Sequence, residues 1–236
     1  LYNAALRLLR GATPQQAMGI AERQEDARRL LRYFGLRQGV EGAFWKELDT
    51  VYFLRHDAEE IAWHTRSLYH RPAPEQPVVK ARLPHIGDEG LQVMVYVQDR
   101  PHLFARLCGF FSRLGYSIAE AKIHTTRHGY ALDSFMLLDP DGTLAYRDMI
   151  SLIEHDLSAR LASGAVPEKA ASGRLSRQVR NFPITPEVQI RQTEKPGQCL
   201  LSIIAADRPG LLFTVASTLD AHDINVHTAK IATLGE

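Results

Sequence analysis

Two short turns in this chain carry residue types that suit the binding of a small zwitterion. One reads Asp207-Arg208-Pro209-Gly210-Leu211, and the other reads Asp99-Arg100-Pro101-His102-Leu103. Each turn leads from an apolar segment into a segment with helical spacing, and the free N–H groups at a helix start bind carboxylates. An aspartate accepts hydrogen bonds from an amino group, and glycine permits close approach of a ligand. The candidate ligand residues are therefore Asp207, Arg208, Gly210 and Leu211, with Asp99 in support.

A capping role is open for the same turn. Asp207 can cap the following helix, with Pro209 in its preferred first-turn position. Capping and ligand binding are compatible, so both interpretations are kept. In the other turn His102 stands at the position of Gly210, which argues against close backbone approach there. We expect the stronger site at the second turn, or one site shared between the two.

The histidines do not predict a metal site. His56-Asp57 has the residue pair of metal-dependent phosphohydrolases, but further His and Asp ligands at suitable spacing are absent nearby. Asp57 is instead predicted to cap a helix together with Glu60. His124 and His128 would share a face only on a helix, and their segment has the pattern of a strand and a turn. The remaining pair considered, His222 and His227, is expected at the surface.

The two turns belong to a longer internal repeat. The run Asp99 to Phe104 returns 108 residues later as Asp207 to Leu212, and the same offset superposes Ala121 to Thr125 on Ala229 to Thr233. Two matching clusters in one register indicate duplication of a structural unit. The chain is therefore predicted to contain two copies of one module.

The amino-acid composition does not indicate a particular binding partner. Of the 236 residues 45% are hydrophobic, and the net charge of +1 gives no bulk basicity for nucleic acid or anionic membrane. No apolar run approaches the ~20 residues that span a bilayer. The start Leu1-Tyr2-Asn3 has no initiator Met or signal peptide, so we expect an internal fragment. Cys108 and Cys199 occupy non-equivalent repeat positions, which favours a reducing, cytoplasmic setting without disulfides.

Residues 1–70 are predicted to be helical and 71–90 to be a stiff linker. Apolar residues recur at helical spacing, as in Phe44, Leu48 and Val51. Proline recurs just after residue 70, which ends the last helix and favours an extended chain.

Residues 91–191 are predicted to form a β-α-β-β-α-β module. Strict alternation from Leu91 to Gln98 indicates a strand, and the stripe that begins at Leu103 indicates a helix ended by Gly115. The remaining elements are expected at 117–126, 130–138, 146–161 and 183–191.

The second module is predicted to span 199–236 and to be incomplete. It has counterparts of the first strand, helix and second strand at 199–206, 209–221 and 224–233, and an exposed sheet edge is expected. Residues 162–178 are expected to form a surface excursion. The fold class is therefore α+β, with an N-terminal helical segment and two ferredoxin-like modules.

The repeated Asp-Arg-Pro turn within βαββαβ modules resembles ACT domains, which sense small molecules in enzymes of amino acid metabolism. A wider resemblance covers essentially the whole chain. Its motifs are Tyr52-Phe53-Leu54-Arg55-His56, Ala62-Trp63-His64, Thr125-Thr126-Arg127-His128-Gly129, Asp133-Ser134-Phe135, Asp139-Pro140-Asp141-Gly142 and Thr233-Leu234-Gly235-Glu236. Together they are similar to the C-terminal part of the bifunctional uridylyltransferase/uridylyl-removing enzymes, which modify the nitrogen signalling protein PII.

The resemblance implies a regulatory fragment of a multifunctional enzyme. In that family one domain attaches UMP to PII, a metal-dependent hydrolase domain removes it, and two ACT domains sense glutamine. No catalytic residue, metal ligand or cofactor is therefore expected in this fragment, while Mg²⁺ is expected for the parent enzyme. The family pattern adds Asn225, a position that faces ligand across an ACT interface, and its repeat equivalent Ser117. ACT–ACT contacts within or between chains are implied, with segment 1–70 transmitting a glutamine-driven shift.

Three alternatives stay open. Asn225 can be a turn residue after Asp223. The ACT signature by itself also fits a sensor pair from another amino-acid-controlled enzyme. The order βαββαβ also occurs in RNA-recognition modules, but Asp133 would lie on the third strand and no basic stripe is present. Nucleic acid and membrane partners are accordingly not expected.

Overall fold

A computed structural model describes residues 14–71, 73–84, 89–139, 146–164, 185–193, 196–208 and 210–232, with side chains from residue 19 onward. Most of the surface excursion expected at 162–178 lies outside these residues. So do Pro209 and everything after residue 232.

The N-terminal part is helical, as predicted. Its described helices are α2 (Pro14–Tyr33), α3 (Gly42–Trp45), α4 (Thr50–Arg55) and α5 (Ala58–Leu68). The predicted start of α5 is confirmed, because Asp57 and Glu60 form a reciprocal capping box. Aromatic and aliphatic side chains, including Phe44, Tyr52 and Ile61, form the core of this helical unit (residues 14–71).

The first repeat contributes four strands and two helices, in an antiparallel α+β arrangement. These are β1 (Val78–Arg82), β2 (Leu91–Gln98), α6 (Leu103–Arg113), β3 (Ser117–His124), β4 (Tyr130–Leu138) and α7 (Tyr146–Ser163). The sheet runs β1-β2-β4-β3-β7, and its last strand comes from the second repeat.

One predicted strand, at 183–191, pairs with a different strand from the one expected. The strand predicted at 183–191 to complete the first module is present as β5 (Glu187–Gln192), but it pairs with β6 (Cys199–Ile204). The sheet edge beside β2 is taken instead by β1, which lies inside the predicted linker 71–90. Glu154 of α7 fixes β1 there, since its Oε1 accepts the Ala81 N–H at 2.9 Å. Each repeat therefore begins with an edge strand: β1, which the alternation did not predict, and β5, which was predicted but assigned to the first module.

The offset of 108 residues recurs in the three-dimensional elements. Helix α6 (Leu103–Arg113) corresponds to α9 (Leu211–Ala221), β2 to β6, and β3 to β7 (Thr228–Ala232). These three correspondences support the prediction of a duplicated structural unit, whose second copy is described only as far as β7.

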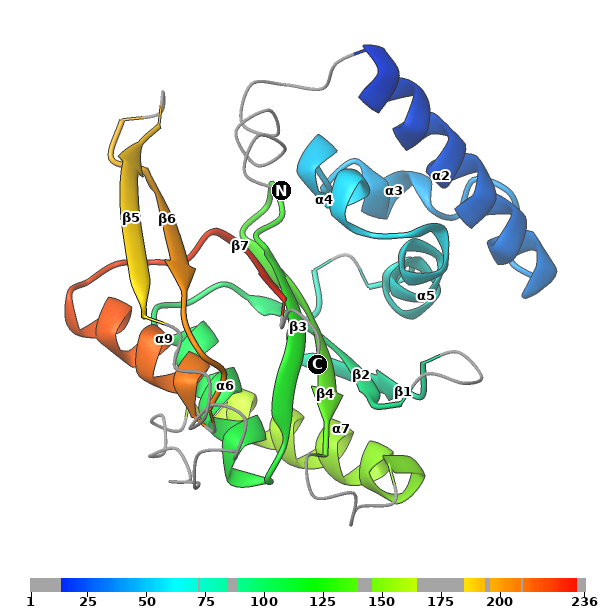
Figure 1. Ribbon diagram of the computed structural model, residues 1–236. Helices are drawn as coiled ribbons and strands as arrows, with labels where there is room; N and C mark the ends of the chain where they lie inside the picture. Colours follow the sequence, from blue (N-terminus) through cyan, green and yellow to red (C-terminus); the bar gives the residue numbers. More distant parts are fainter. Residues whose placement is uncertain are drawn as a thin grey trace.

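The sheet lies between two helical layers (Figure 1). Helices α6, α7 and α9 lie on one side, and the helical unit lies on the other. Strand β2 shows the consequence: Val93 and Val95 belong to the α6–α7 core, whereas Met94 and Tyr96 belong to the core of the helical unit. The predicted alternation is correct, but both of its faces are buried.

The two repeats join along what we call the seam, the pairing of β3 with β7 together with the contact of α6 with α9. Lys122 of β3 pairs with Lys230 of β7, which is its own repeat equivalent. Flanking pairs are reciprocal, because Ile123 pairs with Ala229 and Ala121 pairs with Ile231. The seam thus has approximate two-fold symmetry centred on Lys122, like the interface of a homodimer.

Candidate functional site

A cavity of about 160 Å³ opens at the seam. Its first wall is the turn from β2 into α6, and its opposite wall comes from the second repeat. Ile123, Ala131 and Asp133 of the sheet also line it. Its lining residues are Asp99, Arg100, Pro101, His102, Leu103, Phe104, Ile123, Thr125, Ala131, Asp133, Ala216, Asp220, Asn225, Val226 and His227. The site therefore belongs to both repeats at once.

The turn before α6 is held by polar contacts on both walls. Thr125 Oγ1 donates to Asp99 Oδ2 at 2.9 Å, and Asp99 N–H bonds to Gly129 O at 2.9 Å. His102 Nδ1 lies 3.2 Å from Asp220 Oδ2 of α9, across the seam. The start of α6, where the first-turn N–H groups have no partner within the helix, consequently faces a cavity whose walls are tied together.

The structure brings together Asp99 and Asn225, two of the predicted ligand residues. The other predicted residues, Asp207, Arg208, Gly210, Leu211 and Ser117, do not line this cavity. Asp207 and Arg208 are exposed in the turn from β6 into α9, and Ser117 opens β3. The arrangement favours the shared-site form of the prediction over a site within the second repeat alone. Ligand binding at any of these residues stays a prediction.

The approximate symmetry explains this distribution. Ser117 is the repeat equivalent of Asn225, and the Asp207 turn is the equivalent of the Asp99 turn. A second, symmetry-related site would therefore join Asp207 and Gly210 to Ser117. His102 and Gly210 share the left-handed conformation, with φ of 67° and 76°. The histidine thus does not prevent the tight turn, although this backbone is unfavourable for any residue with a Cβ.

Replacing His102 by glycine is expected to stabilise the fold modestly. Relief of the left-handed strain should contribute about 1 kcal/mol, less the exposed contact with Asp220. Asp223→Gly is the matched control, because Asp223 also has a positive φ of 55° but does not line the cavity. Urea unfolding measures both. A clear loss of stability in His102→Gly would show that the contact with Asp220 outweighs the strain.

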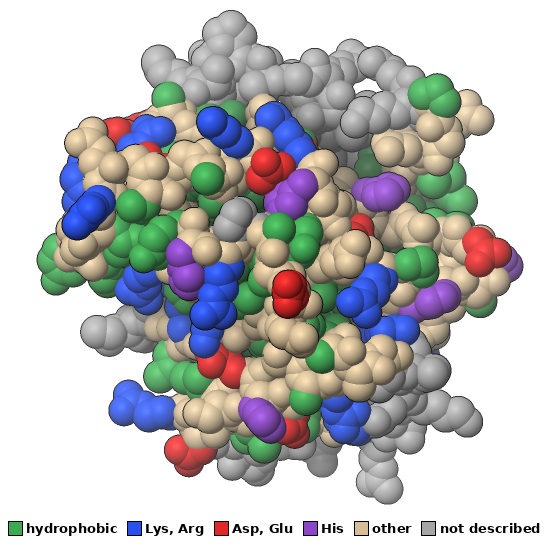
Figure 2. Space-filling view, turned by 180° about the vertical axis from the view of Figure 1, so that it is seen from behind, with side chains coloured by type: hydrophobic (Ala, Val, Ile, Leu, Met, Phe, Trp, Pro, Cys, Tyr) green, Lys and Arg blue, Asp and Glu red, His purple; other side chains and the backbone are tan. Residues whose placement is uncertain are grey.

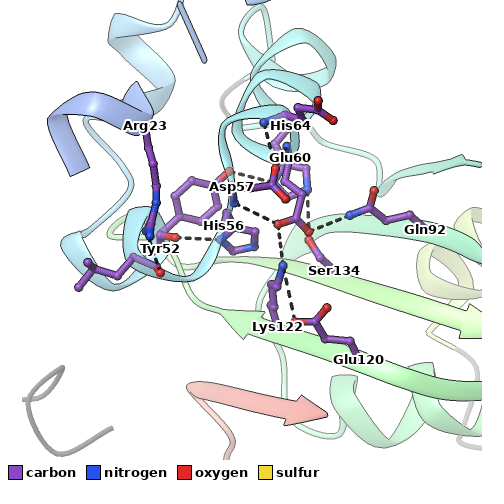
Figure 3. Close-up of polar contacts among 12 residues, drawn as sticks. Arg23, Tyr52, His56, Asp57, Glu60, His64, Gln92, Glu120, Lys122 and Ser134 are labelled. Atoms are coloured by element: carbon purple, nitrogen blue, oxygen red, sulfur yellow. Dashed lines mark hydrogen bonds and ion pairs between the residues drawn. The ribbon is translucent and has the colours of Figure 1, made fainter. Parts of the chain in front are cut away.

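A second polar cluster lies between the helical unit and the sheet (Figure 3). Lys122 Nζ is 2.6 Å from Glu60 Oε2, and Gln92 Nε2 donates to Glu60 Oε1 at 2.8 Å. Arg82 Nε in turn donates to Gln92 Oε1 at 2.7 Å. Burial raises the pKa of Glu60, and Lys122 counteracts that rise. The sequence did not predict this cluster, because the only role predicted for Glu60 was to cap a helix together with Asp57.

Three buried histidines adjoin the same cluster. Tyr52 Oη and His64 Nδ1 are 2.8 Å apart, and His64 Nε2 is 3.1 Å from Ser134 Oγ. His56 stacks on Tyr52, with ring centroids 4.2 Å apart. Burial lowers the pKa of His56 to about 3 and that of His64 well below its usual value. Burial also lowers the pKa of His124, and all three rings are consequently neutral at pH 7.

The helical unit contacts both strands of the seam. Glu60 holds Lys122 of β3, as described, and Arg55 reaches β7. Arg55 Nη1 donates to Thr228 Oγ1 at 2.6 Å and to Ala229 O at 3.0 Å. A change in how β3 and β7 pair would therefore alter the contacts that α4 and α5 make with these strands.

The described part of the chain shows neither a metal site nor a basic surface for nucleic acid. Those residues contain no group of three His, Cys, Asp or Glu side chains able to hold a metal ion. Figure 2 shows Lys and Arg side chains scattered among other types, without a continuous basic stripe on the described atoms of that face. Among the described helices, none combines the length and apolar character needed to cross a membrane.

The family comparisons divide the chain as the fold does. The profile of the fifth domain of uridylyltransferase GlnD matches residues 15–67, and that of the ACT domain matches 92–145 and 200–236. A bifunctional uridylyltransferase/uridylyl-removing enzyme from Aromatoleum aromaticum is 61% identical over 236 residues, covering 100% of this chain and 27% of the relative. Enzymes of the same name from Ralstonia nicotianae and Chromobacterium violaceum are each 49% identical, covering 100% of this chain and 28% of the relative.

The chain corresponds to the C-terminal part of the uridylyltransferase/uridylyl-removing enzymes.

The chain spans little more than a quarter of the length of these curated relatives. Within the uridylyltransferase/uridylyl-removing enzyme, it comprises ACT regulatory modules and the adjoining fifth domain rather than catalytic domains. The fifth-domain match coincides with α2 to α5, whereas the ACT match begins at β2 and omits β1 and β5. No solved structure matches the chain.

Proposed function

We propose that this region is the glutamine sensor of a uridylyltransferase/uridylyl-removing enzyme and that the ligand binds in the seam cavity. The observation that supports the proposal most is the meeting of Asp99, the start of α6 and Asn225 in one cavity between two ACT repeats. The N–H groups of the first turn of α6 would bind the ligand carboxylate. The amide of Asn225 offers both a donor and an acceptor to the amide of glutamine. A volume near 160 Å³ suits an amino acid rather than a nucleotide.

The proposed regulation rests on the seam. A ligand held by both repeats stabilises one arrangement of β3 against β7, and it shifts the equilibrium by its difference in affinity for two arrangements. Such coupling is typically ~1 to 3 kcal/mol. Arg55 and Glu60 give the helical unit a contact to each strand of the seam. We propose that these contacts transmit the shift, restraining UMP transfer and favouring UMP removal.

The parent protein is proposed to act in the cytoplasm on PII, as part of nitrogen regulation. The Mg²⁺ expected for its catalysis would be held by residues outside this chain, because the described residues do not fit a metal site. No step of the regulation proposed here uses that ion. Contacts between ACT repeats within the chain are those of the seam, and contacts between chains remain part of the proposal.

Asn225→Ala is expected to weaken glutamine binding at least ten-fold, which corresponds to about 1.4 kcal/mol, the loss of an amide hydrogen bond with its partner left unpaired. Ser117→Ala is the matched control, because Ser117 is the repeat equivalent and lies outside the cavity. Calorimetric titration of the full-length enzyme with glutamine measures both, with glutamate, serine and UMP as competing candidates.

Two results would count against a glutamine site confined to the seam cavity. Equal losses in Asn225→Ala and Ser117→Ala would mean that the symmetry-related site also binds. An unchanged affinity in Asn225→Ala, with glutamine bound by the wild type, would remove the seam cavity as the glutamine site.

A further inference from the structure

The seam cavity contains a buried carboxyl group whose negative charge would have no counter-ion among the described residues. Asp133 of β4 lines the cavity and is only 1% exposed. Its neighbours on the same face of β4 are Ala131 and Phe135, which belong to the apolar core between the sheet and α6. An ionisable group at such a position is costly unless something compensates for it.

Within the described residues that compensation is slight. Asp133 Oδ1 accepts one hydrogen bond, from the His124 N–H at 3.3 Å, and no salt bridge reaches the carboxyl. An ionised carboxylate has about four acceptor positions, so most of its capacity is unused. The groups around it are Asp99 of the β2–α6 turn, the Cys108 thiol of α6 and the backbone of β3. None of these supplies a positive charge.

The cavity around Asp133 is rich in carboxyl groups. Asp99 and Asp220 line it together with Asp133, while Arg100 lies exposed in its outer turn. His102 and His227 line it too, and His102 is engaged by Asp220. In the described part of the chain, a ligand that is a plain anion would find no cationic partner beside Asp99 and Asp133. A ligand that carries an ammonium group beside its carboxylate would match them, with the carboxylate at the start of α6 and the cation deeper at the sheet.

We propose that Asp133 binds the ammonium group of the ligand and so restricts the seam cavity to amino acids with a free α-amino group. This inference rests on the proposed function, since it names the residue that recognises one part of the same ligand. Asp99 then supports the ammonium from the cavity wall, while Thr125 keeps its carboxylate oriented.

Binding should release a proton. Burial raises the pKa of Asp133 to about 8, and the nearby Asp99 adds to the rise. At pH 7 the empty cavity therefore contains mainly the neutral acid. An ammonium ion favours the carboxylate, so Asp133 passes its proton to solvent as the ion pair with the ligand forms. The ammonium group itself keeps its three protons.

The test is calorimetric titration of the full-length enzyme at pH 6.5 and 7, in two buffers that differ in ionisation enthalpy. The wild type is expected to release a substantial fraction of one proton per glutamine bound, and to bind glutamine at least ten-fold more tightly than its deaminated analogue. Asp133→Asn should bind glutamine at least ten-fold more weakly, release no proton and lose the preference for the amino group. Asp148→Asn, the same change at an exposed position on α7, should match the wild type.

Failure of this inference is distinct from failure of the proposed function. Glutamine that binds the wild type without proton release, and no better than its deaminated analogue, would overturn the role of Asp133 even if Asp133→Asn does not fold. The same conclusion follows if Asp133→Asn folds and keeps both affinity and preference. Absence of glutamine binding to the wild type would instead contradict the proposed function itself.

Discussion

Lowering the pH from 6.5 to 4.5 is expected to destabilise the protein by about 4 kcal/mol, much of a typical stability of roughly 5 to 15 kcal/mol. The cause is that His56, His64 and His124 are buried as neutral rings. Their pKa values in the folded state lie below those of the unfolded chain. Their stabilising contribution is therefore complete above the unfolded value near 6.5 and is lost as the pH falls below it.

The magnitude follows from counting protons. Three histidines that bind protons only when unfolded would cost about 4 kcal/mol per pH unit. The raised pKa values of Glu60 and Asp133 act in the opposite direction, because those groups take up protons first in the folded state. We therefore expect a net loss of about 2 kcal/mol per pH unit.

Urea unfolding at pH 6.5, 5.5 and 4.5 measures this loss. Both tryptophans, Trp45 and Trp63, lie in the helical unit, so their fluorescence reports on the part that contains His56 and His64. His56→Phe should reduce the pH dependence by about 1.4 kcal/mol per unit, whereas His155→Phe, at an exposed position on α7, should not. A stability that stays flat from pH 6.5 to 4.5 would show that these rings are protonated in the folded protein.

Lys122→Met is expected to cost about 3 kcal/mol at pH 8, because it leaves the carboxylate of Glu60 without its counter-ion. Glu60 and Lys122 have side chains only 6% and 11% exposed, so water cannot take over the role of the lost partner. Loss of Lys122 also removes the influence that lowers the pKa of Glu60. Protonation of Glu60 should therefore reduce the cost as the pH falls towards 5.

A double substitution makes this prediction sharper. Glu60→Gln combined with Lys122→Met removes both charges, and it should recover most of the lost stability. Glu120→Gln is the matched control: its carboxylate lies 3.7 Å from Lys122 but is 39% exposed, so its removal should cost less than about 0.5 kcal/mol. A double variant no more stable than Lys122→Met would mean that the lysine contributes by packing alone. If the helical unit transmits the ligand signal, Lys122→Met should also bind glutamine while responding to it less.

The repeat explains why much of the fold was predictable. Alternation from Leu91 to Gln98 and the helical stripe after it predicted β2 and α6, and the offset then predicted β6 and α9. Helix α5 was predictable for a local reason, because its capping box lies within four residues. The edge strand β1 was not, since it is short and partly exposed and is fixed by Glu154, which lies far along the chain. The burial of Met94 and Tyr96 could not be predicted from β2 alone either, because the helical unit, which lies elsewhere in the sequence, covers them.

The residue types of the candidate site were predictable from the sequence. Which residues of the two repeats meet in one cavity was less predictable. The Asp-Arg-Pro turn and Asn225 were found from sequence, but a site within the second repeat and a site shared between the repeats both stayed open. The pairing of β3 with β7 brings Asn225 to the Asp99 turn of the other repeat. No local pattern encodes that long-range register. Asp133 was considered only as part of a motif and as a residue of the third strand, since nothing local shows that its carboxyl is buried beside a cavity.

The central claim is that one amino acid binds between the two repeats, and a crystal structure of the protein grown with glutamine tests it most directly. The account predicts density in the seam cavity, with the ligand carboxylate at the start of α6, its ammonium near Asp133 and its amide at Asn225. Density at the symmetry-related position between Asp207, Gly210 and Ser117, with the seam cavity empty, would contradict it.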